Sequence, residues 1–105
     1  MAIARPVSGA LDTNEDVYYA LALQKGEYAV SLDLTHRNGA NTNITGYLAL
    51  LDADGGNQRR LADVNEIGAS RQVVSSVSMK RDDTVILRIK NWQAAFNYTV
   101  RVAAK

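Results

Sequence analysis

The sequence contains no cysteine, and its 105 residues include only one proline and one histidine. The absence of cysteine excludes disulfide bonds, thiolate metal sites and a cysteine nucleophile. A serine-based triad would depend on the one histidine, His36, yet no serine lies in a G-x-S-x-G motif. We therefore expect no catalytic apparatus, and we expect that the protein is not an enzyme.

An excess of charge of one sign and a long apolar run are also missing. The formal net charge is +1, so no overall field attracts the chain to nucleic acid. No stretch approaches the roughly 20 apolar residues that a membrane helix needs, and we expect neither nucleic-acid binding nor membrane insertion. The N-terminal residues MAIARPVSG lack the apolar core of a signal peptide. Two locations stay open: a secreted or periplasmic domain separated from its signal peptide, or the cytoplasm.

Alternation of apolar and polar residues is the main pattern that the sequence does contain. Side chains point to opposite faces along a strand, so such a segment can bury one face and expose the other. The segments with clear or weaker alternation are 17–23, 28–34, 46–52, 59–64, 73–79, 84–90 and 96–102. The residues expected in the core include Leu21, Leu32, Leu87 and Val100. Segment 61–70 has an alternative interpretation as a helical turn.

The segments between these strands have the composition of turns and loops. Residues 24–27 (QKGE) are expected to form a hairpin turn with Gly26 at a positive φ, and residues 80–83 another turn. Residues 35–45 read as a long polar loop, and residues 91–95 link the last two strands. Short strands separated by turns roughly every 8–12 residues predict an antiparallel all-β sandwich or barrel.

Acidic side chains gather at two places that could hold a calcium ion. Asp52 and Asp54 lie in DADGGN, and carboxylate oxygens suit calcium. The EF-hand pattern fails there, because the glycine and the glutamate that the pattern requires further along are both missing. A tight turn is the better interpretation. Glu15 and Asp16 lie just before a strand, where a calcium site competes with a solvated loop. Apart from calcium, we expect no cofactor.

The only tryptophan, Trp92, lies between two expected strands, where a core residue is not required. Its ring is therefore a candidate for stacking on a sugar or anchoring a protein partner. Tyr18 and Tyr47 would join it if they face outward, and His36 would be presented by its polar loop. The alternative is that Trp92 folds back over the end of the sandwich.

Three basic residues, Arg88, Lys90 and Arg101, are expected to share the exposed face of the last two strands. Such a stripe can meet phosphates. Because no aromatic side chain is expected among them, and because the net charge is small, a solubilising surface is the better interpretation.

Three segments in order resemble a known family. They are SGALDTNEDVYYALALQKGEYAVSL (8–32), GYLALLDADGG (46–56) and VILRIKNWQAAFNYTVRV (85–102). Together they are similar to the bacterial pre-peptidase C-terminal domain, and the likeness runs from about Val7 to Val102. The resemblance implies a jelly-roll β-sandwich of seven to eight strands. It also implies a single domain over residues 1–105, with a flexible segment at about residues 1–8.

The resemblance also implies a function. Members of this family are parts of exported bacterial enzymes, and some bind calcium near their N-terminal segment. Others bind collagen or polysaccharide through exposed aromatic rings. We therefore expect a non-catalytic accessory or binding module that contacts a polysaccharide, a protein polymer or a neighbouring domain. The alternative is a structural domain that assembles into a homo-oligomer without a small ligand.

Overall fold

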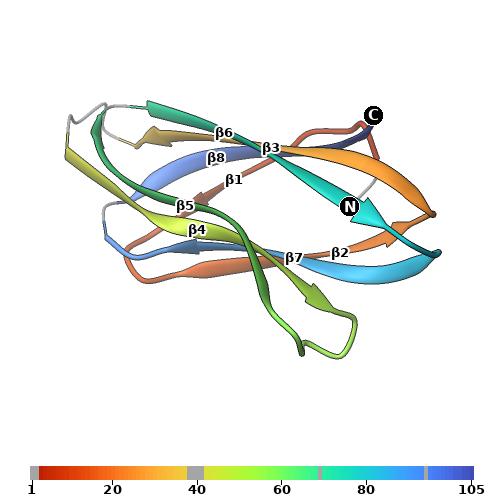
Figure 1. Cartoon of the computed structure of the whole chain (residues 1–105). Helices are drawn as coiled ribbons and strands as arrows, with labels where there is room; N and C mark the ends of the chain where they lie inside the picture. The colour runs from red at the N-terminus through yellow and green to blue at the C-terminus, as the bar shows by residue number, and fades with distance from the viewer. Residues whose placement is uncertain (1–2, 38–41, 69, 94) are drawn as a thin grey trace.

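The computed structural model describes residues 3–37, 42–68, 70–93 and 95–105, and these form eight strands (Figure 1). The strands are β1 (Val7–Leu11), β2 (Asp16–Leu23), β3 (Gly26–His36), β4 (Thr42–Asp52), β5 (Arg59–Gly68), β6 (Ser70–Met79), β7 (Asp83–Asn91) and β8 (Phe96–Ala104). The described residues contain no helix that is long and apolar enough to cross a membrane.

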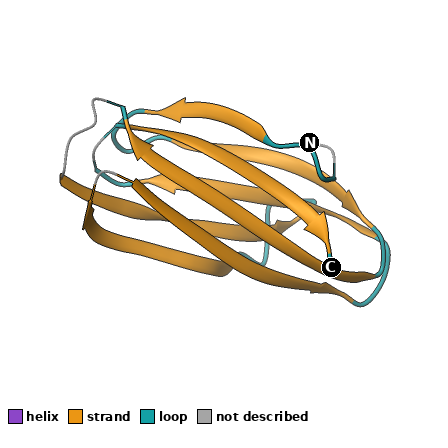
Figure 2. Cartoon of the chain, turned by 90° about the horizontal axis from the view of Figure 1, so that it is seen from above, coloured by secondary structure: helices purple, strands orange, loops and turns teal. Residues whose placement is uncertain are grey.

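The strands form two antiparallel sheets that pack face to face (Figures 1 and 2). The strand order is β1-β8-β3-β6 in the first sheet and β2-β7-β4-β5 in the second sheet. Along the chain, successive strands alternate between the sheets, except that β4 and β5 are neighbours in one sheet. This order is the jelly-roll arrangement, so the predicted fold class is confirmed.

The core lies between the two sheets and is built from alternate residues of each strand. Leu21, Leu32, Leu87 and Val100, which the sequence placed in the core, are all at most 1% exposed. Burying each such side chain contributes roughly 1.5–3 kcal/mol relative to leaving it in water. β4 is apolar on both faces, and it lies between β5 and β7.

Two local predictions and one alternative interpretation need correction. Residues 24–27 do not form a hairpin within one sheet, because β2 pairs with β7 whereas β3 pairs with β6 and β8. Gly26 has a positive φ of 147°, as predicted. A short turn with such a glycine can connect strands of two different sheets as well as the two strands of a hairpin. Residues 61–68 belong to β5 and residue 70 begins β6, so the alternative of a helical turn was wrong for these residues. β1 was not predicted, and it includes residues 7 and 8 of the segment expected to be flexible.

Candidate functional site

The outer surface of the second sheet brings together three aromatic residues that the sequence singled out. Across β2 and β7, Tyr18 lies opposite Arg88, and across β4 and β7, Tyr47 lies opposite Lys90. Because paired residues share a face, all four side chains project from the same surface. Trp92 follows β7 directly, and its backbone N–H donates to the carbonyl oxygen of Thr45 at 2.8 Å. We call the surface formed by Asp16, Tyr18, Tyr47, Arg60, Arg88, Lys90 and Trp92 the aromatic face.

Cations and rings alternate on the aromatic face. The guanidinium carbon of Arg60 lies 3.9 Å from the ring centroid of Tyr47. The guanidinium carbon of Arg88 lies 5.3 Å from the Tyr47 ring and 5.4 Å from the Tyr18 ring. The Lys90 ammonium lies 4.9 Å from the Trp92 ring. Each contact is close enough for a cation–π attraction, so the rings are held in defined positions.

The three rings differ in exposure. Tyr47 is only 4% exposed, whereas Tyr18 is 52% exposed and Trp92 is 44% exposed. The rings of Tyr47 and Trp92 meet edge to face with centroids 6.0 Å apart. Tyr47 therefore supports its neighbours, and Tyr18 and Trp92 present ring surface to solvent.

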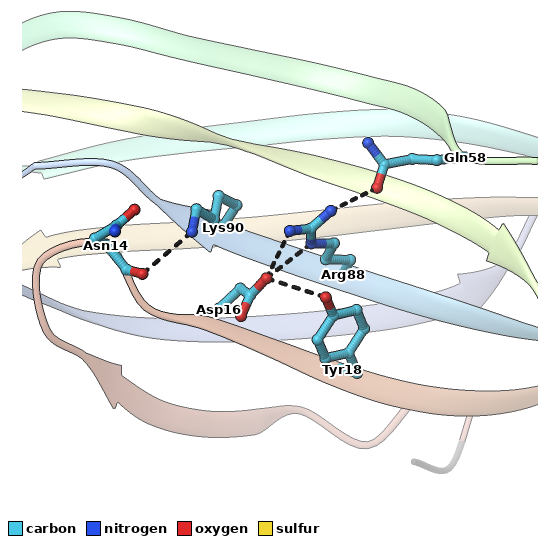
Figure 3. A network of polar contacts seen from close by, with 6 residues as sticks. All are labelled: Asn14, Asp16, Tyr18, Gln58, Arg88 and Lys90. Carbon is cyan, nitrogen blue, oxygen red and sulfur yellow. Dashed lines mark hydrogen bonds and ion pairs between the residues drawn. The ribbon is translucent and has the colours of Figure 1, made fainter. Parts of the chain in front are cut away.

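A hydrogen-bond network fixes Arg88 in the middle of this surface (Figure 3). Its Nε and Nη2 atoms donate to Oδ2 of Asp16 at 3.0 and 2.7 Å. Its Nη1 atom donates to Oε1 of Gln58 at 2.8 Å. The Tyr18 hydroxyl donates to the same Asp16 oxygen at 3.1 Å. One carboxylate oxygen thus accepts three hydrogen bonds and links β2 to β7.

The negative charge of Asp16 and the positive charge of Arg88 stabilise each other. Burial alone would raise the pKa of Asp16, but hydrogen bonds from Arg88 and Tyr18 and the charges of Arg88 and Lys90 lower it overall. Burial would lower the pKa of Arg88, yet its hydrogen bond to Asp16 leaves that pKa raised. Both groups are therefore ionised at neutral pH, and the ion pair persists there.

The loop between β1 and β2 borders the aromatic face and is tied to the end of β7. Asn91 is fully buried, and its Nδ2 atom donates to the carbonyl oxygen of Asp12 at 2.8 Å. Its backbone N–H donates to the carbonyl oxygen of Glu15 at 2.9 Å. Within the loop, Asn14 has a positive φ of 64°, which asparagine tolerates better than most residues, and its carbonyl oxygen accepts from Lys90 Nζ at 3.1 Å.

His36, the fourth candidate binding residue, lies elsewhere. It is 4% exposed and ends β3, opposite Phe96 in the first sheet. The expectation of an exposed loop histidine was wrong, because the alternation of β3 continues through Leu34 to His36 and turns this side chain inward.

The acidic candidates for calcium all contact protein donors. Asp52 Oδ2 accepts from Asn57 at 2.6 Å, and Asp54 Oδ1 accepts from the Gly56 N–H at 2.9 Å. These are contacts of a tight turn, the interpretation that the sequence favoured. Glu15 Oε1 accepts from the Asp12 N–H at 2.7 Å, which stabilises the loop before β2.

The two acidic pairs cannot cooperate, because they lie at opposite ends of β7. Asp16 is opposite Lys90 and Asp52 is opposite Val85. In the described part of the chain, no group of three or more His, Cys, Asp or Glu side chains is placed to hold a metal ion. Calcium binding by these residues stays a prediction.

The basic stripe is also arranged differently from the prediction. β7 and β8 belong to different sheets, so Arg101 lies on the opposite outer surface from Arg88 and Lys90. The expectation that no aromatic ring lies among these cations was also wrong, because rings lie next to both Arg88 and Lys90. Sequence analysis also missed Arg60 and Gln58. The positions of these two residues depend on a register shift between Leu48 and Ala49, which sets the pairing of β5 with β4. No pattern in the sequence predicts this shift.

A groove of about 350 Å³ lies at the other end of the sandwich, next to the β4–β5 turn. Its charged residues include Arg59, Arg81 and Asp83, and Arg81 and Asp83 approach each other to 3.7 Å. The groove shares no residue with the aromatic face.

Known structures share this architecture. The pre-peptidase C-terminal domain of a collagenase from Bacillus anthracis matches with a TM-score of 0.56 and 12% sequence identity, over 95% of this chain and 89% of that one. This chain has a jelly-roll sandwich like that of the pre-peptidase C-terminal domain. A family 35 carbohydrate binding module from Clostridium thermocellum also matches this chain, with a TM-score of 0.56 and 9% sequence identity, over 92% of this chain and 90% of that one.

The same sandwich occurs in proteins of other kinds. A mitogen derived from Yersinia pseudotuberculosis matches with a TM-score of 0.57 and 13% identity, over 96% of this chain and 85% of that one. No family model matches the sequence, and no curated protein matches it. Identities this low establish the jelly-roll fold alone, so the function has to be argued from the aromatic face.

Proposed function

We propose that this chain is a non-catalytic module of an exported bacterial protein, and that it binds a polysaccharide through the aromatic face. The observation that carries the proposal is the pair of exposed rings, Tyr18 and Trp92, on one surface of a rigid sheet. Sugar rings have apolar faces that stack on aromatic rings and hydroxyl groups that bond to polar neighbours. Asp16, Arg88 and Gln58 supply polar groups beside the rings.

The spacing of the two rings suits a polymer better than a single sugar. Tyr18 lies opposite Arg88, and Trp92 lies four positions further along the chain than Arg88. At about 3.3 Å per strand residue, the two attachment points are roughly 13 Å apart along the sheet. An extended chain of several sugar units can contact both rings at once.

The rigidity of the surface supports the same function. Tyr47 supports Trp92 from the side, and Arg88 is held by Asp16 and Gln58. Binding to side chains that are already ordered loses less conformational entropy than ordering them on contact. Similarity to carbohydrate binding modules and to a pre-peptidase C-terminal domain is consistent with an exported, non-catalytic role.

Affinity electrophoresis and Trp92 fluorescence with a panel of soluble neutral and acidic polysaccharides test the proposal. Trp92 is the only tryptophan, so its emission reports on the aromatic face alone. We expect at least one polymer to bind, and we expect Trp92→Ala and Tyr18→Ala to weaken binding about tenfold or more.

Val74→Ala is the matched control, because Val74 is 63% exposed on the outer surface of the first sheet. It should leave binding unchanged. Failure of every polymer to bind, or wild-type affinity in Trp92→Ala, would overturn the proposal. A stable oligomer in light scattering, together with no polysaccharide binding, would favour the assembly alternative.

A further inference from the structure

Lys90 distinguishes the aromatic face from a surface built only for neutral sugars. We propose that the aromatic face selects a polysaccharide that carries carboxylate groups, and that the Lys90 ammonium contacts one of them. This inference rests on the proposed polysaccharide binding and adds the chemical class of the sugar. Three observations carry it: the charge balance of the face, the hydrogen bonds of Lys90 and its position beside Trp92.

The charge balance leaves one cation over. Arg60 pairs with Asp63 at 2.5 Å, and Arg88 pairs with Asp16 at 2.7 Å. Lys90 lies opposite Asp16 in the β2–β7 register, but the three hydrogen bonds to Asp16 Oδ2 come from Arg88 and Tyr18. Among the described residues of this surface, three cations therefore face two carboxylates, and an anionic group on a ligand would balance the third cation.

The hydrogen bonds of Lys90 are incomplete. An ammonium has three donors, and within the described residues Asn14 provides the acceptor for Lys90, through its carbonyl oxygen at 3.1 Å. The Lys90 residue is only 9% exposed, and a lysine covered to this extent ordinarily has a charged partner. A carboxylate could accept a charge-assisted hydrogen bond from this ammonium, which is stronger than a bond to a neutral oxygen.

The position of Lys90 links the charge to the stacking surface. Its ammonium lies 4.9 Å from the ring centroid of Trp92, one of the two exposed rings. The carboxylate of a uronic acid projects from the edge of the sugar ring. A uronic acid that stacks at Trp92 can therefore place its carboxylate next to Lys90.

The same charges argue against a nucleic-acid strand as the polyanion. Tracking a phosphate backbone requires several free cations, and here two of the three are paired with Asp16 and Asp63. The net charge of +1 adds no long-range attraction.

The test compares one polymer in two chemical forms, polygalacturonate and the same polymer after reduction of its carboxyl groups. Binding is measured by Trp92 fluorescence titration at low ionic strength. We expect the acidic form to bind about tenfold more tightly, the size expected for one hydrogen bond to a charged group. In Lys90→Gln this preference should disappear, so that the acidic and the reduced polymer bind with similar affinity.

Lys25→Gln is the matched control, because it removes the same charge from the β2–β3 turn, next to Asp82 at the other end of β7. It should keep the full preference for the acidic polymer. Circular dichroism should show that both variants fold.

The outcomes separate the two proposals. Equal binding of both forms, or an unchanged preference in Lys90→Gln, overturns the carboxylate inference and leaves polysaccharide binding standing. A loss of preference in Lys25→Gln as large as in Lys90→Gln also overturns it. Stronger binding of single-stranded polyuridylate than of polygalacturonate overturns it in favour of nucleic acid. Binding of no polysaccharide of any kind removes the proposed function itself.

Discussion

The two outer surfaces of the sandwich share one fold and one alternation pattern, but they carry different chemistry. The outer surface of β2-β7-β4-β5 has three aromatic rings, with cations placed against them. In its described residues, the outer surface of β1-β8-β3-β6 has no aromatic ring. Its side chains are mostly small or polar, including Ser8, Ala29, Ser31, Asp33, Gln72, Ser76, Asn97 and Thr99. The first sheet folds and packs without aromatic side chains on its outer surface. The fold therefore does not require the aromatic rings on the outer surface of the second sheet.

The contacts on the two surfaces also differ in how they are connected. On the first sheet they are separate pairs, such as Ser8 with Thr99 at 2.9 Å and Ser78 with Glu27 at 2.6 Å. On the aromatic face, Arg88 alone contacts Asp16 and Gln58 and lies near two rings. Substitutions in a shared network couple to each other, whereas separate pairs behave additively.

The largest effect is expected from Gly46→Ala, compared with Gly9→Ala in the first sheet. A Cβ atom on Gly46 would lie 2.0 Å from the carbonyl oxygen of Lys90, so β4 and β7 would have to separate. A Cβ atom on Gly9 would meet the buried ring of Tyr98, with the hydroxyl oxygen at 2.5 Å, so a side chain rather than the backbone of a paired strand would have to move. We expect losses of unfolding free energy of about 3 kcal/mol or more for Gly46→Ala and about 1–2 kcal/mol for Gly9→Ala.

Urea denaturation of the two glycine variants measures this difference. A smaller loss in Gly46→Ala than in Gly9→Ala would contradict the close approach of β4 and β7 beneath the aromatic face.

The next effect compares two aspartates, Asp16→Ala on the aromatic face and Asp33→Ala on the first sheet. Removing Asp16 leaves Arg88, whose side chain is 21% exposed, without its carboxylate partner. We expect this to reduce the unfolding free energy by about 2 kcal/mol. Asp33 is exposed, and its removal should change the unfolding free energy by less than about 0.5 kcal/mol. Equal losses in urea denaturation would show that the network adds nothing to stability.

The pH dependence sharpens the same comparison. The pKa of Asp16 is lowered in the folded protein, so its contribution to stability is fully present above the unfolded value of about 3.9. That contribution is lost as the pH falls through the lower, folded pKa. Urea midpoints measured from pH 6 downward should therefore fall less steeply below about pH 4 in Asp16→Ala than in Asp33→Ala. Parallel curves for the two variants would contradict the pKa shift.

Most of the fold could be predicted from the sequence, because burial in a sandwich imposes a period of two. The alternation of Tyr28, Val30, Leu32 and Leu34 predicts the inward face of β3, and the structure confirms it. The pairing of strands could not be predicted in the same way. A short turn such as residues 24–27 can close a hairpin or cross between sheets, and alternation is identical in both cases.

The candidate site was predictable only in part, for the same reason. The sequence included Tyr18 and Tyr47 only on the condition that they face outward. The pairing of β2, β7 and β4 shows that they share a surface with Trp92, where Tyr18 is exposed and Tyr47 is only 4% exposed. The pairing also separates Arg101 from Lys90, which sequence proximity had placed together. Side-chain contacts across strands depend on register, and register is set by packing and bulges that no local pattern records.

The smallest effect is expected from Arg60→Ala, with Arg101→Ala on the first sheet as its control. Arg60 covers the Tyr47 ring at 3.9 Å, but its side chain is 48% exposed and its ion pair with Asp63 is near the surface. Because exposed cation–π contacts and ion pairs are weak, the unfolding free energy should fall by less than about 1 kcal/mol.

Removing Arg60 would uncover Tyr47 as a third ring between Tyr18 and Trp92. We therefore expect a neutral polysaccharide to bind Arg60→Ala a few-fold more tightly than wild type, and Arg101→Ala to bind like wild type, in the same fluorescence titration. Weaker binding by Arg60→Ala would show that the guanidinium group itself contacts the sugar. The aromatic face would then depend on its cations for binding as well as for holding its rings in place.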